Sequence, residues 1–436
     1  MRSPHSDGRM VKGRVQTLHS YSMFLRLLCL FVASLTVEFR FNAAAAARVH
    51  FALMLTLLDR SHRRQFLRVG GLSLGGLTLA DWFAWKAFAK AQKLPLRDKS
   101  VIFLFQHGGP SQFETFDPKM DAPREIRSAT GEIPTRLPGV TFGSTLERLA
   151  KLNDKFTIVR SFSTGDANHD IKPIVGRDTL RANMGTLYAR VAGALRPESA
   201  MPTNVALFPR AVDPASGPAI TQFGNFEATG EFGSAYAPFV PGTGGGLQAD
   251  LKLNLPQARL NDRRELLASL DQWKRRVEAD GSFAGQDQFQ QQAFAALERG
   301  LADAFDLGSE DPRVVARYDT APLMRRDHFS PQWKNREHYA DNAATLGKLL
   351  LLARRLCERG AGFVTVTTSF VWDMHADVNN APMTVGMDYV GRPFDHAVSA
   401  FIEDCEARGL RDKILLVCCG EMGRTPRINA KGGRDH

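Results

Sequence analysis

The sequence predicts an α/β protein with a mostly parallel central sheet flanked by helices. Three observations support this fold class. The last third of the chain alternates helix and strand patterns twice, with short connections that fit right-handed crossovers between parallel strands. Its strand patterns are continuous apolar runs, which are typical of strands buried on both faces. Both helical patterns end at a glycine, the usual stop signal before a following strand.

Four apolar runs are candidates for strands of this sheet. Each is short, bounded by glycine or polar residues, and rich in Val, Ile, Leu or Phe. They are 99–109 ("KSVIFLFQHGG"), 154–163 ("DKFTIVRSFS"), 363–370 ("FVTVTTSF") and 413–419 ("KILLVCC"). The two helices predicted in the last third span 341–360 and 394–409.

The middle of the chain contains two stretches of different character. Residues from about 202 to 246 are rich in Pro, Gly and Phe without periodicity, which predicts a long irregular insertion. Residues 258–307 carry two helical patterns with charge-laced faces, which are typical of solvated helix surfaces. We therefore expect one globular domain over 93–436, interrupted by this insertion.

Residues 54–92 resemble an export signal. Arg63 and Arg64 precede a Phe-Leu pair, a Gly-rich apolar run and an Ala-containing "AFAKAQ", which is the order found in twin-arginine signals. An amphipathic first helix is the alternative. The four glycines between Gly70 and Gly76 disfavour that helix, since each costs about 1 kcal/mol relative to Ala. We therefore expect the twin-arginine machinery as a partner, and a periplasmic or secreted protein.

Residues 1–53 form a doubtful N-terminal extension, either disordered or not translated. Their apolar segment "MFLRLLCLFVASLTVEF" is interrupted by Arg26 and is short for a membrane span, so no stable transmembrane span is expected. Translation is expected to start at Met54; an N-terminal membrane anchor is the alternative. The extension has seven Lys/Arg and two Asp/Glu, a net charge of +5. Because the whole chain has a net charge of +10, the rest of the chain carries 10 − 5 = +5. That remainder shows no dense basic tract with aromatics, which argues against nucleic acid as a partner.

Residue types that bind metals follow the predicted strands, where ligands of parallel sheets collect. His107 follows the first run, and Asp373 and His375 follow the third. Asp435 and His436 come after two glycines that permit close backbone approach. Imidazole and carboxylate groups from several strand ends predict a site for Zn, Mn or another divalent ion. Taken singly, each residue is more simply explained as a hydrogen-bonded loop residue.

Several motifs resemble a known bacterial family, domain of unknown function 1501. They are "RRQFLRVGG", "QHGGPSQFETFDPK", "WDMH" and "LLVCCGEMGRTPRINAKGGRDH", and the resemblance covers about 60–436. It implies an alkaline-phosphatase-like or sulfatase-like fold, with a metal-assisted hydrolase site at the strand ends, and export by a twin-arginine signal. Chains of this family normally continue beyond "GGRDH", so the resemblance also implies a domain that is incomplete at its C-terminus.

The resemblance also suggests catalytic residues. "PIVGR" is similar to a sulfatase "LLTGR" stretch, but no Cys precedes it, so formylglycine chemistry is not expected. His169 is a candidate ligand or general acid. Arg424 is a candidate for holding a phosphate or sulfate bidentately, and a salt bridge to Glu421 is the alternative. The candidate nucleophiles are Ser111, Ser163 and Thr164.

The predicted function is that of an exported, metal-dependent hydrolase of phosphate or sulfate esters. The ion would polarise the ester oxygen and lower the pKa of a bound water or hydroxyl. The alternative is a catalytically silent member of the fold that binds an anionic glycan or a partner protein. In both cases, we expect an anionic ester or glycan as the small-molecule partner.

Overall fold

The computed structural model of this protein describes residues 99–242, 259, 262 and 302–436. The predicted extension at 1–53, the export signal with Arg63 and Arg64, and most of the helical stretch at 258–307 lie outside the described residues. The chain divides into two compact units, and the unit described below comprises Ser100–Val159 and Thr164–His436. Among the described helices, none is both long and apolar enough to cross a membrane.

A parallel sheet of four strands lies at the centre of this unit, in the order β4-β5-β1-β6. In β1, Val101 aligns with Phe363 of β5 on one side and with Leu415 of β6 on the other. All of β1 is buried, as expected for a strand with neighbours on both edges. The predicted α/β class with a parallel sheet is thus confirmed. The strands are β1 (Ser100–Phe105), β4 (Asn204–Leu207), β5 (Phe363–Thr367) and β6 (Ile414–Cys419).

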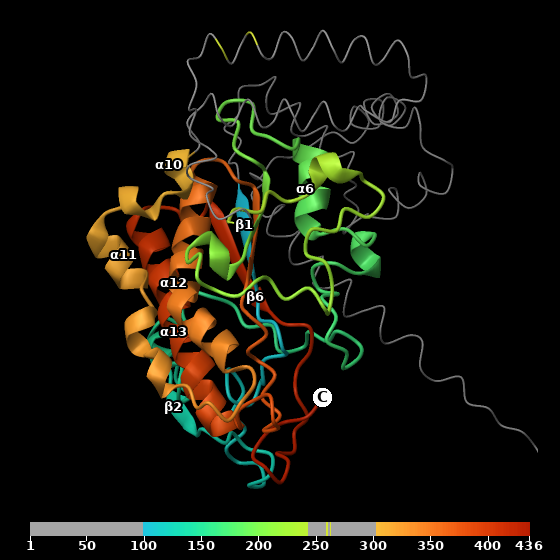
Figure 1. The fold of residues 1–436 in the computed structure, drawn as a ribbon. Helices are drawn as coiled ribbons and strands as arrows, with labels where there is room; N and C mark the ends of the chain where they lie inside the picture. Colours follow the sequence, from blue (N-terminus) through green and yellow to red (C-terminus); the bar gives the residue numbers. More distant parts are fainter. Residues whose placement is uncertain (1–98, 243–258, 260–261, 263–301) are drawn as a thin grey trace, which may run out of the picture. The chain divides into compact units, whose positions relative to one another are not determined.

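Helices cover both faces of the sheet (Figure 1). α12 (Arg336–Glu358) and α13 (Met383–Ala407) pack against each other over one face, whereas α6 (Met184–Ala192) lies over the other and contacts β4 and β5. The α12–α13 layer contributes Leu350 and Phe394 to the apolar core. The other α-helices and β-strands of the described residues are α5 (Glu147–Lys151), α10 (Ala302–Phe305), α11 (Pro312–Tyr318), β2 (Glu132–Pro134) and β3 (Thr141–Gly143).

Two predictions about strands are wrong. The run at 154–163 forms no strand, and its Phe156 and Ile158 pack, half-buried, against the core from a loop. Conversely, the stretch at about 202–246 is not wholly irregular, because it contains the buried strand β4. With only four residues, β4 is too short for its pattern to stand out among Pro and Gly. An apolar run therefore does not by itself predict pairing within the sheet.

Both long helices begin earlier than predicted. α12 begins at Arg336 and not at 341, and α13 begins at Met383 and not at 394. Pro393 lies inside α13, where it removes one backbone hydrogen bond because proline has no N–H donor. Met387 and Phe394, on either side of Pro393, are buried in the core. Their packing stabilises the helix across the missing hydrogen bond.

The carboxyl ends of three strands meet at one level of the sheet. Phe105 of β1 aligns with Thr367 of β5 and with Cys419 of β6. The loops that follow therefore leave from the same edge, which is where parallel sheets bind ligands. Gly108, just after β1, has φ +113°, and a Cβ there would lie 2.5 Å from the backbone nitrogen of Asp373. Only glycine lets the loops after β1 and β5 approach so closely.

Asp395 of α13 holds the beginning of α5. Its carboxylate accepts the backbone N–H groups of Arg148 at 2.9 Å and Leu149 at 2.7 Å. These groups lie in the first turn of α5, where helical N–H donors lack partners within the helix. Burial outweighs these hydrogen bonds and the charge of Arg148, and it raises the pKa of Asp395 to about 6.

Replacing Asp395 by asparagine should remove a pH-dependent part of the stability. Because the pKa is raised, the folded protein binds the proton more tightly than the unfolded chain. This stabilisation is complete below the ordinary pKa of 3.8 and is lost as the pH rises through about 6. The shift of about two pKa units corresponds to roughly 3 kcal/mol. Between pH 4 and pH 8, the free energy of unfolding of the wild type, measured with urea, should fall by most of this amount relative to that of Asp395→Asn. A pH-independent difference would contradict this prediction.

Candidate metal centre

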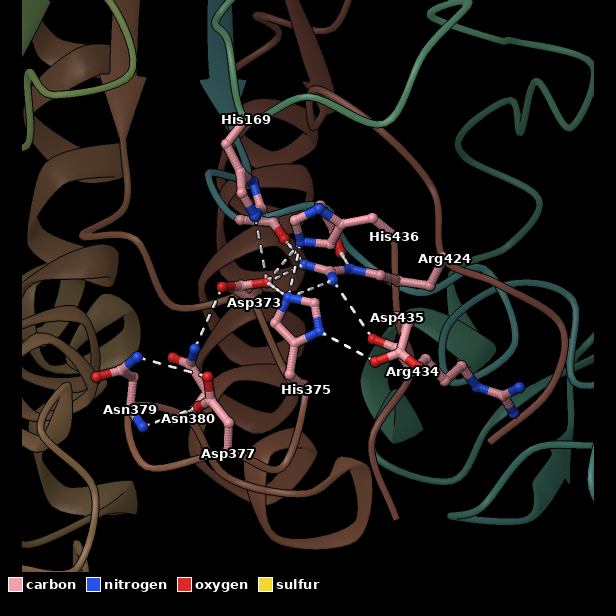
Figure 2. Close-up of polar contacts among 12 residues, drawn as sticks. His169, Asp373, His375, Asp377, Asn379, Asn380, Arg424, Arg434, Asp435 and His436 are labelled. Carbon is pink, nitrogen blue, oxygen red and sulfur yellow. Dashed lines mark hydrogen bonds and ion pairs between the residues drawn. The ribbon is translucent and has the colours of Figure 1, made fainter. Parts of the chain in front are cut away.

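Three segments bring four possible metal ligands together at the carboxyl edge of the sheet (Figure 2). His169 comes from the loop before α6, Asp373 and His375 from the loop after β5, and His436 from the segment after β6. One ligand atom from each of the four lies within 4.8 Å of the others. Asp373 is buried, whereas the side chain of His436 is 33% exposed, so the group is open on one side. We call these four residues the His/Asp cluster.

The cluster converges on one atom, Oδ1 of Asp373. The Nε2 atoms of His375, His169 and His436 lie 2.7, 3.3 and 3.4 Å from it. The Nε2 atoms of His375 and His436 are also only 2.7 Å apart. Two imidazole nitrogens at this distance need a proton or a cation between them, because unprotonated ring nitrogens are both acceptors. The cluster therefore has the geometry of donor atoms gathered around one cation.

The surroundings keep Asp373 ionised. Burial alone would raise its pKa, but hydrogen bonds from His169 and His375 and the charge of Arg424 outweigh burial and hold the pKa well below its usual range. Burial and the charge of Arg424 lower the pKa of His436, so its ring is neutral at neutral pH. A carboxylate and a neutral imidazole are the protonation states that bind metal ions.

Carboxylates lie behind two of the three histidines. Glu421, which follows β6 and is fully buried, accepts a hydrogen bond from Nδ1 of His169 at 2.9 Å. Asp435 lies 3.4 Å from Nδ1 of His375. In both rings Nδ1 thus faces a carboxylate, which leaves Nε2 directed at Asp373. Hydrogen bonds to Asp373 and Glu421 outweigh burial and raise the pKa of His169, so a metal ion would replace the proton on its Nε2. Such carboxylate–histidine pairs are the usual surroundings of metal ions in proteins.

A buried ion pair anchors the segment that carries His436. Arg434 and Glu114 are both fully buried, and they pair through Nη2 and Oε1 at 2.8 Å and through Nε and Oε2 at 2.9 Å. The preceding Gly433 has no room for a side chain, because a Cβ would lie 2.1 Å from the carbonyl carbon of His375. The ion pair and the glycine together place His436 beside His375.

The donor set of the cluster fits a divalent transition-metal ion. Three imidazole nitrogens and one carboxylate oxygen suit Zn²⁺ or Mn²⁺, and four such ligands match tetrahedral zinc. The side-chain charges agree with a divalent cation. Asp373, Glu421 and Asp435 are acidic and Arg424 is basic, so their formal charges sum to −3 + 1 = −2. The cluster could therefore hold a divalent ion.

Arg424 is fully buried and pairs with Asp373 in place of the predicted partner Glu421. Its Nη2 lies 2.6 Å from Oδ1 of Asp373 and donates to the carbonyl of Gly108 as well. Its Nε donates to the carbonyl of Gly109 at 2.8 Å. The guanidinium thus compensates the charge of Asp373 and ties down the glycine turn after β1.

Ser111 and Thr164, both predicted as nucleophiles, lie outside the cluster. Ser111 is fully buried and donates its hydroxyl hydrogen to Glu114, the partner of Arg434. The hydroxyl of Thr164 lies 3.4 Å from the carbonyl oxygen of Asp166. Ser111 therefore supports the buried ion pair that anchors the last segment.

His107, predicted as a metal ligand, is placed in an aromatic environment. Its ring packs against Phe105, Phe223, Phe226 and Phe370, with centroids 4.9 to 6.0 Å apart. Burial lowers its pKa to about 4, so it is neutral at pH 7. Within the described residues it is not a member of the His/Asp cluster.

Of the other predicted ligands, Asp373, His375 and His436 belong to the cluster, and so does His169. Asp435 lies behind His375 as its carboxylate partner. Sequence reasoning considered Glu421 only as a partner of Arg424. Its position directly after β6 was the available signal, because an acidic residue at the end of a buried parallel strand lies at the ligand-binding edge.

The fold and the cluster together define an α/β protein with a candidate metal centre at the carboxyl edge of its parallel sheet. The model of a family described as "Protein of unknown function (DUF1501)" matches residues 98–436. The chain belongs to this family, as its motifs predicted. A search of curated proteins and a search of solved structures gave no match.

Glu421→Gln should weaken metal binding without unfolding the protein. The amide keeps the size of the side chain but removes the charge that holds His169 in the metal-binding tautomer. Loss of such a partner typically reduces metal affinity about 10- to 100-fold. Calorimetric titration of the metal-free protein with Zn²⁺ measures this change. Glu403→Gln, an exposed acidic residue paired with Arg148, is the matched control and should bind like the wild type. Equal affinity in the folded Glu421→Gln variant would contradict the prediction.

Proposed function

We propose that this protein is a metal-dependent hydrolase in which the His/Asp cluster holds a divalent ion, Zn, Mn or similar. The observation that carries the proposal is the approach of three imidazole Nε2 atoms to Oδ1 of Asp373. A bound ion would polarise an ester oxygen and lower the pKa of water at the centre. The residues of the chain supply the binding and the orientation.

Each of the surrounding residues has a defined part in this proposal. Glu421 and Asp435 orient His169 and His375, respectively. Hydrogen bonds from His169 and His375, with the charge of Arg424, keep Asp373 ionised. The partly exposed His436 borders the open side, through which a substrate would arrive. The hydroxyl of Ser111 bonds to Glu114 and that of Thr164 lies against the carbonyl of Asp166, so water is the proposed nucleophile.

The proposed substrates are phosphate or sulfate esters. This substrate class and an alkaline-phosphatase-like fold rest on the family resemblance, and the parallel sheet with the cluster at its carboxyl edge agrees with them. The domain would act outside the cytoplasm, in the periplasm or after secretion. The pair Arg63 and Arg64 with the apolar run that follows supports export by the twin-arginine machinery.

A catalytically silent protein is the second candidate. It is favoured by Arg424, whose guanidinium lies 2.6 Å from Oδ1 of Asp373 and compensates its charge without an ion. In that case the cluster is an internal hydrogen-bonded network. Its open side, beside His436, would then bind an anionic glycan or a partner protein.

Elemental analysis by plasma mass spectrometry distinguishes the two candidates. The purified wild type should contain about one equivalent of a transition metal per chain, as expected for one four-ligand site. Asp373→Ala combined with His375→Ala should lose it. The control is Asp327→Ala combined with His328→Ala, an exposed pair of the same residue types. A folded wild type without metal, even after incubation with Zn²⁺ or Mn²⁺, would contradict the hydrolase proposal and favour the silent protein.

A further inference from the structure

The charge balance of the centre bears on which ester it accepts. The side chains around the cluster carry a formal charge of −2, from three carboxylates and Arg424. A divalent ion brings the sum to zero. Among the described residues, Arg424 is the one cation that contacts the cluster. The loaded centre therefore has no excess positive charge to offer an anionic substrate.

Arg424 is not free to supply that charge. Its side chain is completely buried and donates to Asp373 and to the carbonyl groups of Gly108 and Gly109. Turning it toward a substrate would break these hydrogen bonds inside the protein and leave the Asp373 charge without its partner. Removing one member of a buried ion pair is strongly unfavourable. The guanidinium therefore stays with Asp373.

One side of the centre is aromatic. The rings of Phe223 and Phe370 stack with centroids 4.5 Å apart. The ring of His169 lies 4.8 Å from Phe370 and 5.3 Å from Phe223. An apolar wall cannot solvate a charged oxygen, and it strengthens the electrostatic interactions beside it. Among the described residues on this side, Phe223 and Phe370 offer a second negative charge on the substrate neither a cation nor a side-chain hydrogen-bond donor.

We propose that the centre prefers esters with a single negative charge, namely phosphodiesters and sulfate monoesters, over doubly charged phosphate monoesters. The inference rests on the proposed hydrolase function. In the reaction, the oxygen of water forms a bond to phosphorus or sulfur while the bond to the leaving oxygen breaks. With a nitrophenyl ester at pH 8, nitrophenolate leaves as the anion. Both protons of the water pass to the solvent from the singly charged esters, whereas with 4-nitrophenyl phosphate one proton stays on the hydrogen phosphate product.

Three substrates with the same leaving group test this preference on the Zn²⁺- or Mn²⁺-loaded wild type at pH 8. Bis(4-nitrophenyl) phosphate and 4-nitrophenyl sulfate are singly charged, whereas 4-nitrophenyl phosphate is doubly charged. We expect kcat/KM for the better of the two singly charged esters to exceed that for 4-nitrophenyl phosphate by about tenfold or more, the effect of one unbalanced charge near the site. Which of the two is better distinguishes a diesterase from a sulfatase. A preference for 4-nitrophenyl phosphate would overturn this inference but leave the proposed hydrolase function standing.

Comparing the same substrates on wild type and on variants of Phe223 cancels the difference in their intrinsic reactivity. Phe223→Lys should shift the ratio of the kcat/KM values about tenfold toward 4-nitrophenyl phosphate, whereas the uncharged Phe223→Met should not. An unchanged ratio in Phe223→Lys would show that charge balance does not set the preference. If the folded, metal-loaded wild type hydrolyses none of the three esters, the proposed function itself fails, and the inference fails with it.

Discussion

The candidate site depends on one carboxylate oxygen, Oδ1 of Asp373. Three imidazole nitrogens and the guanidinium of Arg424 lie 2.6 to 3.4 Å from this atom. Because Asp373 is buried, a carboxylate there is costly unless cations or donors surround it. The requirement to compensate this charge explains why such distant parts of the chain meet at this edge. It also explains why Arg424 is buried with Asp373 and does not point into solvent.

The backbone makes this convergence possible. β1, β5 and β6 end at one level, so that the loops after them share an edge of the sheet. Gly108 and Gly433 then allow contacts that a Cβ atom would prevent. The buried pair of Arg434 and Glu114 fixes the segment just before His436. Removing one partner of such a pair typically costs about 3–5 kcal/mol, so this ion pair contributes to the site although it lies outside the cluster.

The sequence predicts the parallel sheet, three of its four strands and most of the cluster. Continuous apolar runs identify β1, β5 and β6, and histidines and acids placed after strands identify Asp373, His375 and His436. Side-chain direction is not predictable in this way. His107 and Ser111 also follow β1, yet His107 packs among phenylalanines and Ser111 bonds to Glu114. Ion pairs between distant positions are not predictable from the sequence pattern either, and Glu114 and Arg434 are 320 positions apart. β4 is missed because four residues carry too little pattern.

The central claim is that the His/Asp cluster binds a metal ion through imidazole nitrogens. X-ray absorption spectroscopy at the edge of the bound metal tests this claim most directly, because imidazole rings give a distinctive multiple-scattering pattern. The structure predicts a first shell with about three imidazole nitrogens and at least one oxygen, at the distances usual for such ligands. A shell of oxygens without imidazole scattering would show that metal binds elsewhere on the protein and would contradict the claim.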